Sequence, residues 1–335
     1  MLGRTALTVS ALGFGCGAVG GLMVRGAADD QRQAVARAIE AGIRYFDTAP
    51  SYGDGRSEEN LGRVLQELGQ DARDLVVGTK VRVPAELFAA PGSAQVVART
   101  VRESIEASLR RLRRERVHLL QLHNRITAGA DGAQGEGLTP AQVTGPVAEA
   151  MRAVQEAGLT EFAGITGTGE APAVEQVLGA GVADTAQLYF NALNPSAGWP
   201  GSAPEGEADF AGLIDSAARQ NVGVIVIRPL AAGAVSASSQ RHANAGSPGT
   251  GTGIAGERFS GDVARAQALV ALAGELGLEG PVELALRFAM AKPGVSTVLV
   301  GYSDGEQLAS AIRWAARGPL PEDAVRRVLA IHRPA

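Results

Sequence analysis

The sequence predicts one α/β domain in which eight parallel strands close into a (β/α)8 TIM barrel, with its active site at the C-terminal ends of the strands. Eight short, mostly apolar runs alternate with stretches of helical periodicity, and this alternation is typical of a parallel sheet covered by helices. Eight such units favour a closed barrel over an open doubly wound sheet, which is the structural alternative. A chain of 335 residues also fits a single barrel.

The predicted strands are rich in valine, isoleucine and leucine, and turn-forming or charged residues bound most of them. Such runs indicate strands that are buried on both faces. In chain order the runs are Val9–Gly15, Ile43–Phe46, Leu75–Thr79, Val117–Leu122, Thr160–Ile165, Thr185–Tyr189, Val222–Ile227 and Val295–Val300.

The segments between these runs have helical periodicity, and two of them stop at a glycine, a common signal for the end of a helix. Gly42 follows one such segment and Gly158 follows another. We expect residues 1–317 to form the barrel and residues 318–335 to form a C-terminal tail packed on it, helical over Ala324–Ile331. The helices predicted within the barrel are Asp30–Ala41, Glu58–Leu68, Ser93–Arg113, Val143–Ala157, Ala171–Leu178, Asp209–Arg219 and helices within Asp262–Leu276 and Val282–Ala289.

Composition restricts the partners of the chain. With 45% hydrophobic and 20% charged residues the chain can bury a large core, and its net charge of −4 provides no general attraction to nucleic acid or anionic membranes. The single cysteine, Cys16, excludes an intrachain disulfide framework and fits a reducing cytoplasm. The apolar stretch Ala6–Val24 lacks an obvious cleavage site, so we interpret it as strand and loop rather than as an export signal.

Four polar residues stand at or just after the ends of predicted strands: Asp47, Tyr52, Lys80 and His123. Because the active sites of parallel barrels lie at the C-terminal ends of the strands, these side chains are expected to meet in one pocket. Lys80 is informative because the 31 basic residues include only two lysines, Lys80 and Lys292. A compact ammonium group tunes the proton affinity of a neighbour better than a guanidinium group does.

These residue types suit proton transfer to or from an oxygen atom. A tyrosine hydroxyl, with a pKa of about 10, is a poor acid at neutral pH, but an adjacent ammonium group stabilises the phenolate. A carboxylate such as Asp47 keeps a buried lysine charged, and a histidine can orient a carbonyl oxygen. The set therefore favours proton delivery to oxygen while a hydride reaches carbon. With four histidines in the chain, no metal cluster is evident.

Two segments, Phe46–Gly53 (FDTAPSYG) and Arg56–Gly62 (RSEENLG), resemble the signature of the aldo-keto reductase family. Lys80 and His123 match the remaining catalytic positions of that family, and the resemblance covers Leu2–Arg317. It implies a (β/α)8 barrel with a nicotinamide cofactor extended across its top.

By this resemblance, Tyr52 is the general acid in carbonyl reduction and the general base in alcohol oxidation. Lys80 and Asp47 tune Tyr52, and His123 orients the substrate. Each residue alone has an ordinary structural interpretation, such as a loop tyrosine or a capping aspartate, but all four stand in register with the family pattern. His118, where related chains often have aspartate, is interpreted as structural.

The resemblance also implies a set of cofactor-binding residues. Thr166 keeps a hydroxyl of the turn that holds the nicotinamide amide, Gly167 replaces an amide side chain there, and Gln187 matches the family's glutamine. The loop Arg228–Gly233 resembles a pyrophosphate loop but lacks the aromatic residue that often stacks on the nicotinamide. The expected cofactor-binding residues are Gly15, Cys16, Thr166, Gly167, Gln187, Arg228, Pro229, Leu230, Gly233, Arg258, Gly301, Ser303 and Gln307.

The segment after the last strand bears on the choice between NAD and NADP. NADP-preferring members of the family usually place arginine or lysine there, whereas this chain has Ser303 and Gln307. Asp304 would repel a 2′-phosphate or accept hydrogen bonds from a free ribose diol. We therefore expect NAD to be used at least as well as NADP. The alternative is that Arg258 restores NADP binding, if the glycine-rich segment Ala243–Gly261 folds over the cofactor instead of forming a surface loop.

The Gly-Ile-Thr-Gly turn and the stretch Tyr189–Ser196 resemble the sugar-dehydrogenase branch of the family, typified by galactose and aldose 1-dehydrogenases. That branch oxidises the anomeric hydroxyl of a sugar to a lactone. The candidate substrate-binding residues lie on loops expected at the top of the barrel: Met23, Phe88, Asn124, Arg125 and Trp199.

Other functions stay open at this point. The chain fits an NADPH-dependent aldehyde or ketone reductase, or a non-catalytic partner subunit that only binds cofactor. A barrel lyase or isomerase with Lys80 as a Schiff-base lysine is a further alternative, although Asp47 and Tyr52 at this spacing fit redox chemistry better. Monomer and homo-oligomer are equally compatible with the sequence.

Overall fold

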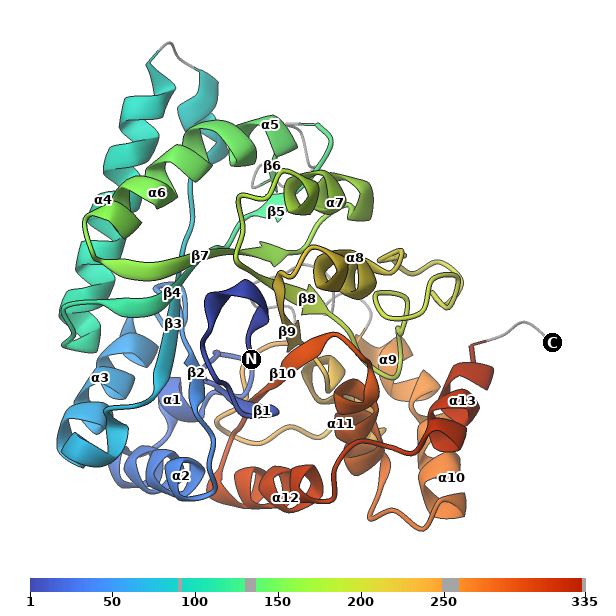
Figure 1. Cartoon of the computed structure of the whole chain (residues 1–335). Coiled ribbons are helices and arrows are strands. Elements are labelled where there is room, and N and C mark those ends of the chain that lie inside the picture. Colours follow the sequence, from blue (N-terminus) through green and yellow to red (C-terminus); the bar gives the residue numbers. More distant parts are fainter. Residues whose placement is uncertain (90–91, 130–136, 249–258, 333–335) are drawn as a thin grey trace.

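The computed structural model describes residues 1–89, 92–129, 137–248 and 259–332. The barrel strands are β1 (Leu12–Gly15), β2 (Tyr45–Asp47), β3 (Val76–Val81), β4 (Val117–Leu122), β7 (Thr160–Gly167), β8 (Thr185–Tyr189), β9 (Gly223–Ile227) and β10 (Val295–Gly301). All neighbours pair in parallel, and the barrel closes in the order β1-β10-β9-β8-β7-β4-β3-β2 (Figure 1). The prediction of a (β/α)8 barrel is confirmed.

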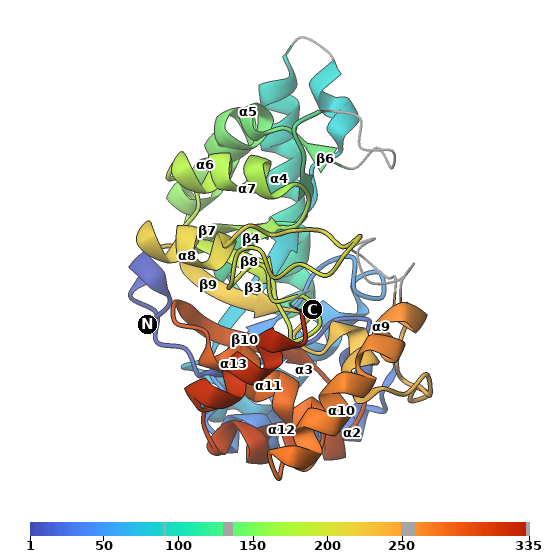
Figure 2. The ribbon, with the colours of Figure 1, turned by 90° about the vertical axis from the view of Figure 1, so that its right-hand side faces the viewer.

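Helices cover the outside of the barrel, and all but the last two lie between successive strands (Figures 1 and 2). They are α1 (Leu22–Arg25), α2 (Ala28–Glu40), α3 (Arg56–Leu68), α4 (Ser93–Leu112), α5 (Pro140–Gln142), α6 (Ala148–Glu156), α7 (Ala171–Gly179), α8 (Leu213–Arg219), α9 (Phe259–Arg265), α10 (Gln267–Glu275), α11 (Pro281–Ala291), α12 (Gly305–Ala316) and α13 (Glu322–Ala330). Within the described ranges, no helix is both long and apolar enough to cross a membrane.

Shorter elements complete the fold. A two-stranded sheet outside the barrel pairs β5 (Arg125–Ile126) with β6 (Gly137–Leu138). The single-turn elements are η1 (Gly3–Thr5), η2 (Gly69–Ala72), η3 (Ala85–Ala89), η4 (Val143–Val147) and η5 (Ala231–Ser236).

Several elements differ from their predicted form; the helix expected over Asp209–Arg219, for example, begins only at Leu213. The helix expected over Val143–Ala157 is regular only from Ala148 onward, because its first part is the π-helical turn η4. In this turn Gly145 leaves helical geometry (φ −98°, ψ −106°) directly before Pro146, as residues before proline tend to do. Helix α12 was not predicted, since the segment after β10 was interpreted only as a binding loop. Asp304 begins this helix as its N-cap and accepts a hydrogen bond from Gln307 N.

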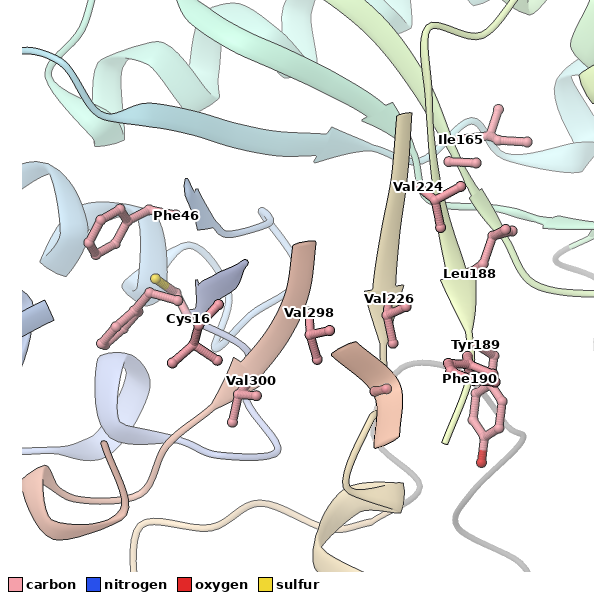
Figure 3. Close-up of a cluster of buried hydrophobic side chains, with 14 of the residues drawn as sticks. Cys16, Phe46, Ile165, Leu188, Tyr189, Phe190, Val224, Val226, Val298 and Val300 are labelled. Atoms are coloured by element: carbon pink, nitrogen blue, oxygen red, sulfur yellow. The ribbon is translucent and has the colours of Figure 1, made fainter. Parts of the chain in front are cut away.

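Side chains alternate between the inside and the outside of the barrel, as strand geometry requires. Val224 and Val226 of β9 belong to the large core between strands and helices, part of which Figure 3 shows. Ile225 and Ile227 of the same strand belong to a smaller core inside the barrel, together with Tyr45 of β2. Asp47, two residues after Tyr45, therefore faces the barrel interior as well.

The C-terminal helix α13 packs against α10 and α11 and buries Ala324 and Val328. His332, just after it, lies with its Nε2 2.8 Å from the carbonyl oxygen of Ala192. This places the tail on the side of the barrel; the division between residues 317 and 318 stays a prediction.

Candidate active site

A cavity of about 1040 Å³ opens at the carboxyl ends of the barrel strands. This volume lies just above the range of about 300–1000 Å³ that is typical of ligand sites. Asp47, Tyr52, Lys80 and His123 all line it. The structure thus brings together four residues that are distant in the sequence, while their catalytic roles stay predictions.

Lys80 is the centre of this group. Its ammonium group forms an ion pair with Asp47 Oδ2 and donates a hydrogen bond of 2.8 Å to the carbonyl oxygen of Thr48. Lys80 Nζ lies 4.7 Å from the centroid of the Tyr52 ring. The rings of Tyr52 and His123 meet edge to face, with centroids 5.9 Å apart and an angle of 85° between their planes. A buried cation and an imidazole therefore both stand beside the phenol.

The protonation states follow from burial and charge. Burial acts to lower the pKa of Lys80, but Asp47 and Tyr52 raise it, and the net shift is upward, so Lys80 stays an ammonium group. Burial raises the pKa of Tyr52, the charge of Lys80 lowers it, and the charge of Asp47 raises it again, for a net increase. Burial lowers the pKa of His123 well below its usual range, and Lys80 and Arg82 act in the same direction. The imidazole is therefore neutral at neutral pH.

The loop that carries Tyr52 is held by the residues of the signature. Tyr52 N donates to the carbonyl oxygen of Ala49 at 3.1 Å, and Ser57 N donates to that of Tyr52 at 3.2 Å. Ser57 Oγ donates to the carbonyl oxygen of Cys16 at 2.8 Å, which leaves Thr48 Oγ1 as the donor in the 2.8 Å contact between the two hydroxyls. These bonds tie the loops after β1 and β2 together.

Glu58 of the same signature anchors α3. Its side chain is fully buried, and it accepts hydrogen bonds from Thr79 Oγ1 (2.5 Å) and Arg111 Nε (2.6 Å). Because Thr79 precedes Lys80 on β3, this contact links α3 and α4 to the strand that carries the lysine.

Most of the expected cofactor residues line the cavity. Cys16 and Gly167 are not part of this lining, and Arg258 lies outside the described residues. Those that line it are Gly15, Thr166, Gln187, Arg228, Pro229, Leu230, Gly233, Gly301, Ser303 and Gln307.

The inner end of the cavity fits an amide-bearing ring. Thr166 Oγ1 is buried and has no hydrogen-bond partner within the described part of the chain. Gln187 lines the cavity beside it on the next strand and donates a 2.6 Å hydrogen bond from Nε2 to Asp47 Oδ1. A buried hydroxyl without a partner costs free energy unless a ligand or water satisfies it. A nicotinamide carboxamide, which carries both a donor and an acceptor, matches this need.

The outer end of the cavity lies at the start of α12. Ser303 Oγ donates to the carbonyl oxygen of Gly20 at 2.7 Å, and Ser303 N donates to Gln307 Oε1 at 2.9 Å. Asp304 Oδ1 accepts from Gln307 N at 2.8 Å, and Asp304 Oδ2 lies 3.6 Å from His242 Nε2. A carboxylate is thus held in place where the ribose of a dinucleotide was expected.

The five proposed substrate residues are not among the described residues that line the cavity: Met23, Phe88, Asn124, Arg125 and Trp199. The amide of Asn124 accepts a hydrogen bond from Val83 N at 2.9 Å and donates one to Val83 O at 2.8 Å. Trp199 packs on Phe190 and Phe288, with ring centroids 5.7 and 5.2 Å away. The geometry gives these five assignments no support.

Sequence reasoning missed several residues of the lining, among them one after β3 and two in the loop after β1. Arg82 lines the cavity; it follows Lys80 by two residues, and the twofold period of strands places such residues on one face. The loop after β1 lines it with Gly17 and Gly20 as well as with the predicted Gly15. Their Gly-x-Gly-x-x-Gly spacing was available as a signal, although here it follows a barrel strand and not a strand of an open sheet. A Cβ atom at Gly20 would lie 2.6 Å from Tyr302 N, so only glycine fits this approach.

The chain is thus a closed parallel barrel that gathers a tyrosine, a lysine, an aspartate and a histidine in one cavity at its strand ends. The model of the Aldo/keto reductase family matches residues 11–333. The chain belongs to this family, which confirms the resemblance found in the sequence.

Three relatives illustrate the similarity. The chain is 35% identical over 166 residues to an L-galactose dehydrogenase of Arabidopsis thaliana (50% of this chain, 47% of that one). It is 39% identical over 137 residues to a D-threo-aldose 1-dehydrogenase of a Pseudomonas species (35% of this chain, 41% of that one). The matches thus span less than half the length of these two relatives. An aldo-keto reductase from Bacillus halodurans, solved in its holo form, shares the fold with a TM-score of 0.70 and 22% identity, covering 100% of this chain and 96% of that one.

Proposed function

We propose that this protein is an NAD(P)-dependent oxidoreductase that interconverts an alcohol and a carbonyl compound, with Tyr52 as general acid and base. The observation that carries the proposal is the buried Lys80–Asp47 ion pair directly beside Tyr52 in the cavity. Membership of the family and the dehydrogenase relatives support it.

The chain's own residues handle the proton. In alcohol oxidation, the substrate oxygen gives its proton to Tyr52 while the carbon loses a hydride; in reduction both steps reverse. Lys80 stabilises the phenolate form of Tyr52, and Asp47 keeps Lys80 charged. Neutral His123 offers a hydrogen bond to the substrate oxygen without competing as an acid. A bound nicotinamide supplies the hydride acceptor or donor, held by Thr166 and Gln187 at the inner end of the cavity.

The substrate class that fits best is an aldose. Two of the three relatives described above are sugar dehydrogenases by name. Near Tyr52 the cavity is lined by the polar side chains of Ser51, Arg82 and His123, which suit a polyhydroxy compound. Oxidation at the anomeric carbon removes one hydride and one proton and yields a lactone. An aldehyde or ketone reductase that uses NADPH is the alternative within the same chemistry.

The cofactor preference proposed here is NAD over NADP. Asp304 is fixed at the outer end of the cavity by the start of α12, and Glu306 lines the cavity next to it. Two carboxylates oppose a 2′-phosphate, while a carboxylate accepts hydrogen bonds from a ribose diol. The competing possibility is that Arg258, outside the described residues, or another basic residue binds the phosphate.

The test is a turnover assay of the purified chain and of Tyr52→Phe. Wild-type protein with NAD or NADP is offered a panel of aldoses and simple alcohols, and with NADH or NADPH a panel of aldehydes. Because general acid–base groups contribute about 10²–10⁴-fold, Tyr52→Phe should lose at least about a hundredfold in kcat while cofactor binding persists. Tyr189→Phe, another buried tyrosine at a strand end outside the cavity lining, is the matched control and should keep wild-type activity.

The outcomes separate the functions. Turnover that survives in Tyr52→Phe removes Tyr52 from its assigned role. Nicotinamide binding with no turnover on any substrate in the panels supports the non-catalytic subunit. Turnover that needs no nicotinamide supports a lyase or an isomerase.

A further inference from the structure

Tyr45 is a buried tyrosine inside the barrel whose hydroxyl group faces the proposed catalytic residues. It is fully buried on β2 and belongs to the inner core with Leu119, Ile225 and Leu299. Its hydroxyl donates a 2.9 Å hydrogen bond to Asp47 Oδ1, two residues along the strand. A phenylalanine would fill the same apolar space, so the hydroxyl is the part of the side chain that the core does not explain.

The barrel leaves room for this ring on both neighbouring strands. Gly13 of β1 and Gly78 of β3 flank β2. A Cβ atom at Gly13 would lie 3.1 Å from Tyr45 Cδ1, and one at Gly78 would lie 3.1 Å from the Tyr45 hydroxyl oxygen. Both distances are closer than ordinary packing allows. The two glycines therefore let the phenol reach the carboxylate.

Asp47 depends on such donors because it is only 1% exposed. Its Oδ1 accepts hydrogen bonds from Tyr45 (2.9 Å) and from Gln187 Nε2 (2.6 Å), and its Oδ2 accepts from Lys80. A buried carboxylate needs its lone pairs satisfied by hydrogen bonds. Burial raises the pKa of Tyr45 well above its usual range, and the charge of Asp47 raises it further, so the phenol stays a donor.

We propose that Tyr45 is a positioning residue that holds Asp47 and, through Asp47, sets the charge balance of the Lys80–Tyr52 pair. The inference rests on the proposed function of Tyr52. The phenol dipole points its positive end at Asp47 and offsets part of the negative charge that reaches Tyr52. Without this dipole, Asp47 opposes formation of the Tyr52 phenolate more strongly, because the charge of Asp47 acts to raise the pKa of Tyr52.

The experiment compares the pH profile of kcat for alcohol oxidation in wild type, Tyr45→Phe and the control Tyr189→Phe. Oxidation requires the phenolate of Tyr52, so kcat rises with pH. Because Tyr45 acts on Tyr52 only through Asp47, Tyr45→Phe should shift this rise upward by at most about one pH unit and lower kcat near pH 7 by up to about tenfold. KM for the cofactor should not change. A profile at the wild-type position, whether or not its height is reduced, would overturn the proposal.

A second measurement does not need turnover. The chain has only four tyrosines, so carbon-13 labelling at the ring Cζ gives four NMR signals, each assigned by its own Tyr→Phe variant. In Tyr45→Phe the Tyr52 signal should begin its titration at higher pH than in wild type, and in Tyr189→Phe at the same pH. Unchanged titration in Tyr45→Phe contradicts the inference. If wild type shows no turnover, the proposed function fails, while this titration still decides the role of Tyr45.

If Tyr45→Phe does not fold, Gly78→Ala tests the same contact with the phenol retained. The added Cβ must push the hydroxyl away from its place, since it would lie 3.1 Å from the oxygen. We expect a smaller upward shift of the Tyr52 titration in this variant. No shift, in a variant that folds and binds cofactor, counts against the proposal.

Discussion

His123 illustrates how burial fixes a chemical role at the scale of one residue. Its side chain is 8% exposed and stands near the cations Lys80 and Arg82, and both effects lower its pKa well below the usual range. A neutral imidazole can donate one hydrogen bond but does not act as a proton source at neutral pH. In the proposed mechanism the role of acid therefore belongs to Tyr52, and the charge of Lys80 acts to lower the pKa of that tyrosine.

The depressed pKa of His123 predicts how stability depends on pH. In the unfolded chain this histidine binds a proton at a pKa of about 6.5, whereas the folded chain resists protonation. The contribution of neutral His123 to the free energy of unfolding is therefore fully present above pH 6.5, and it is lost as the pH falls toward the folded-state pKa. The free energy of unfolding should therefore be lower at pH 5.0 than at pH 7.5.

Urea unfolding of wild type and His123→Gln at these two pH values measures this loss. Other groups that titrate in this range, His118 and His332 among them, are common to both proteins, so the difference of the two pH effects isolates His123. Equal losses of unfolding free energy in the two proteins would show that His123 is protonated in the folded state.

At the scale of elements, α3 is the helix that fixes the active-site loop. Ser57 and Glu58 of its first turn carry the contacts to the β1 loop and to Thr79 described above. Further along the helix, a Cβ at Gly62 would lie 2.5 Å from the carbonyl oxygen of Arg111 on α4. The glycine thus lets the backbones of α3 and α4 approach closely.

We predict that Gly62→Ala destabilises the fold by about 1–3 kcal/mol, because the added methyl group meets backbone that cannot rotate away. Gly274→Ala is the matched control. It changes a glycine inside α10 whose Cβ position has no neighbour within 4 Å, and alanine should stabilise that helix by up to about 1 kcal/mol. Both are measured by urea unfolding at pH 7.5. A Gly62→Ala variant as stable as wild type would show that α3 and α4 can separate at little cost.

Two strands and one helix show which elements can be predicted from the sequence. The strands β4 (Val117–Leu122) and β8 (Thr185–Tyr189) have the predicted bounds, because continuous apolar runs between turn residues leave few alternatives. Helix α12 was missed because its N-cap, Asp304, was interpreted only as a ligand-facing residue, although Gln307 three positions on completes a helix-start pattern.

For the site, the prediction from sequence was limited by the direction in which loop side chains point. Asp47, Lys80 and His123 were placed correctly in the cavity because strand ends of a barrel converge whatever the loops do. Asn124 and Trp199 were assigned from loops, where direction depends on tertiary contacts such as the bonds of Asn124 to the backbone of Val83. No local sequence pattern encodes such contacts.

At the scale of the whole molecule, the mouth of the cavity is bordered by segments that are far apart in the chain. Gly246 N donates to the carbonyl oxygen of Val19 at 3.0 Å, and Asn244 Nδ2 donates to that of Ser303 at 3.0 Å. Arg25 Nε donates to the carbonyl oxygen of Asn244 at 2.7 Å. The loop after β1, the segment around Asn244 and the start of α12 thus form one connected rim. A ligand that contacts this rim stabilises segments that are far apart in the sequence.

Because the rim joins segments that are distant in the sequence, cofactor binding should raise the Tm of the whole protein. A dinucleotide at a hundred times its Kd adds about 2.7 kcal/mol, which raises Tm by several degrees in a protein of this size. We predict a larger rise with NADH than with NADPH at equal concentration, because the charge of Asp304 opposes the extra phosphate.

The variant Asp304→Asn tests this reason. It keeps a side chain that caps α12 but removes the charge, so it should increase the Tm gain with NADPH relative to the gain with NADH. Glu306→Gln makes the same charge change in the first turn of α12 and serves as the control. It should shift the ratio of the NADPH and NADH gains less, since Glu306 is exposed. A larger Tm gain with NADPH in the wild type would instead mean that a basic residue grips the phosphate.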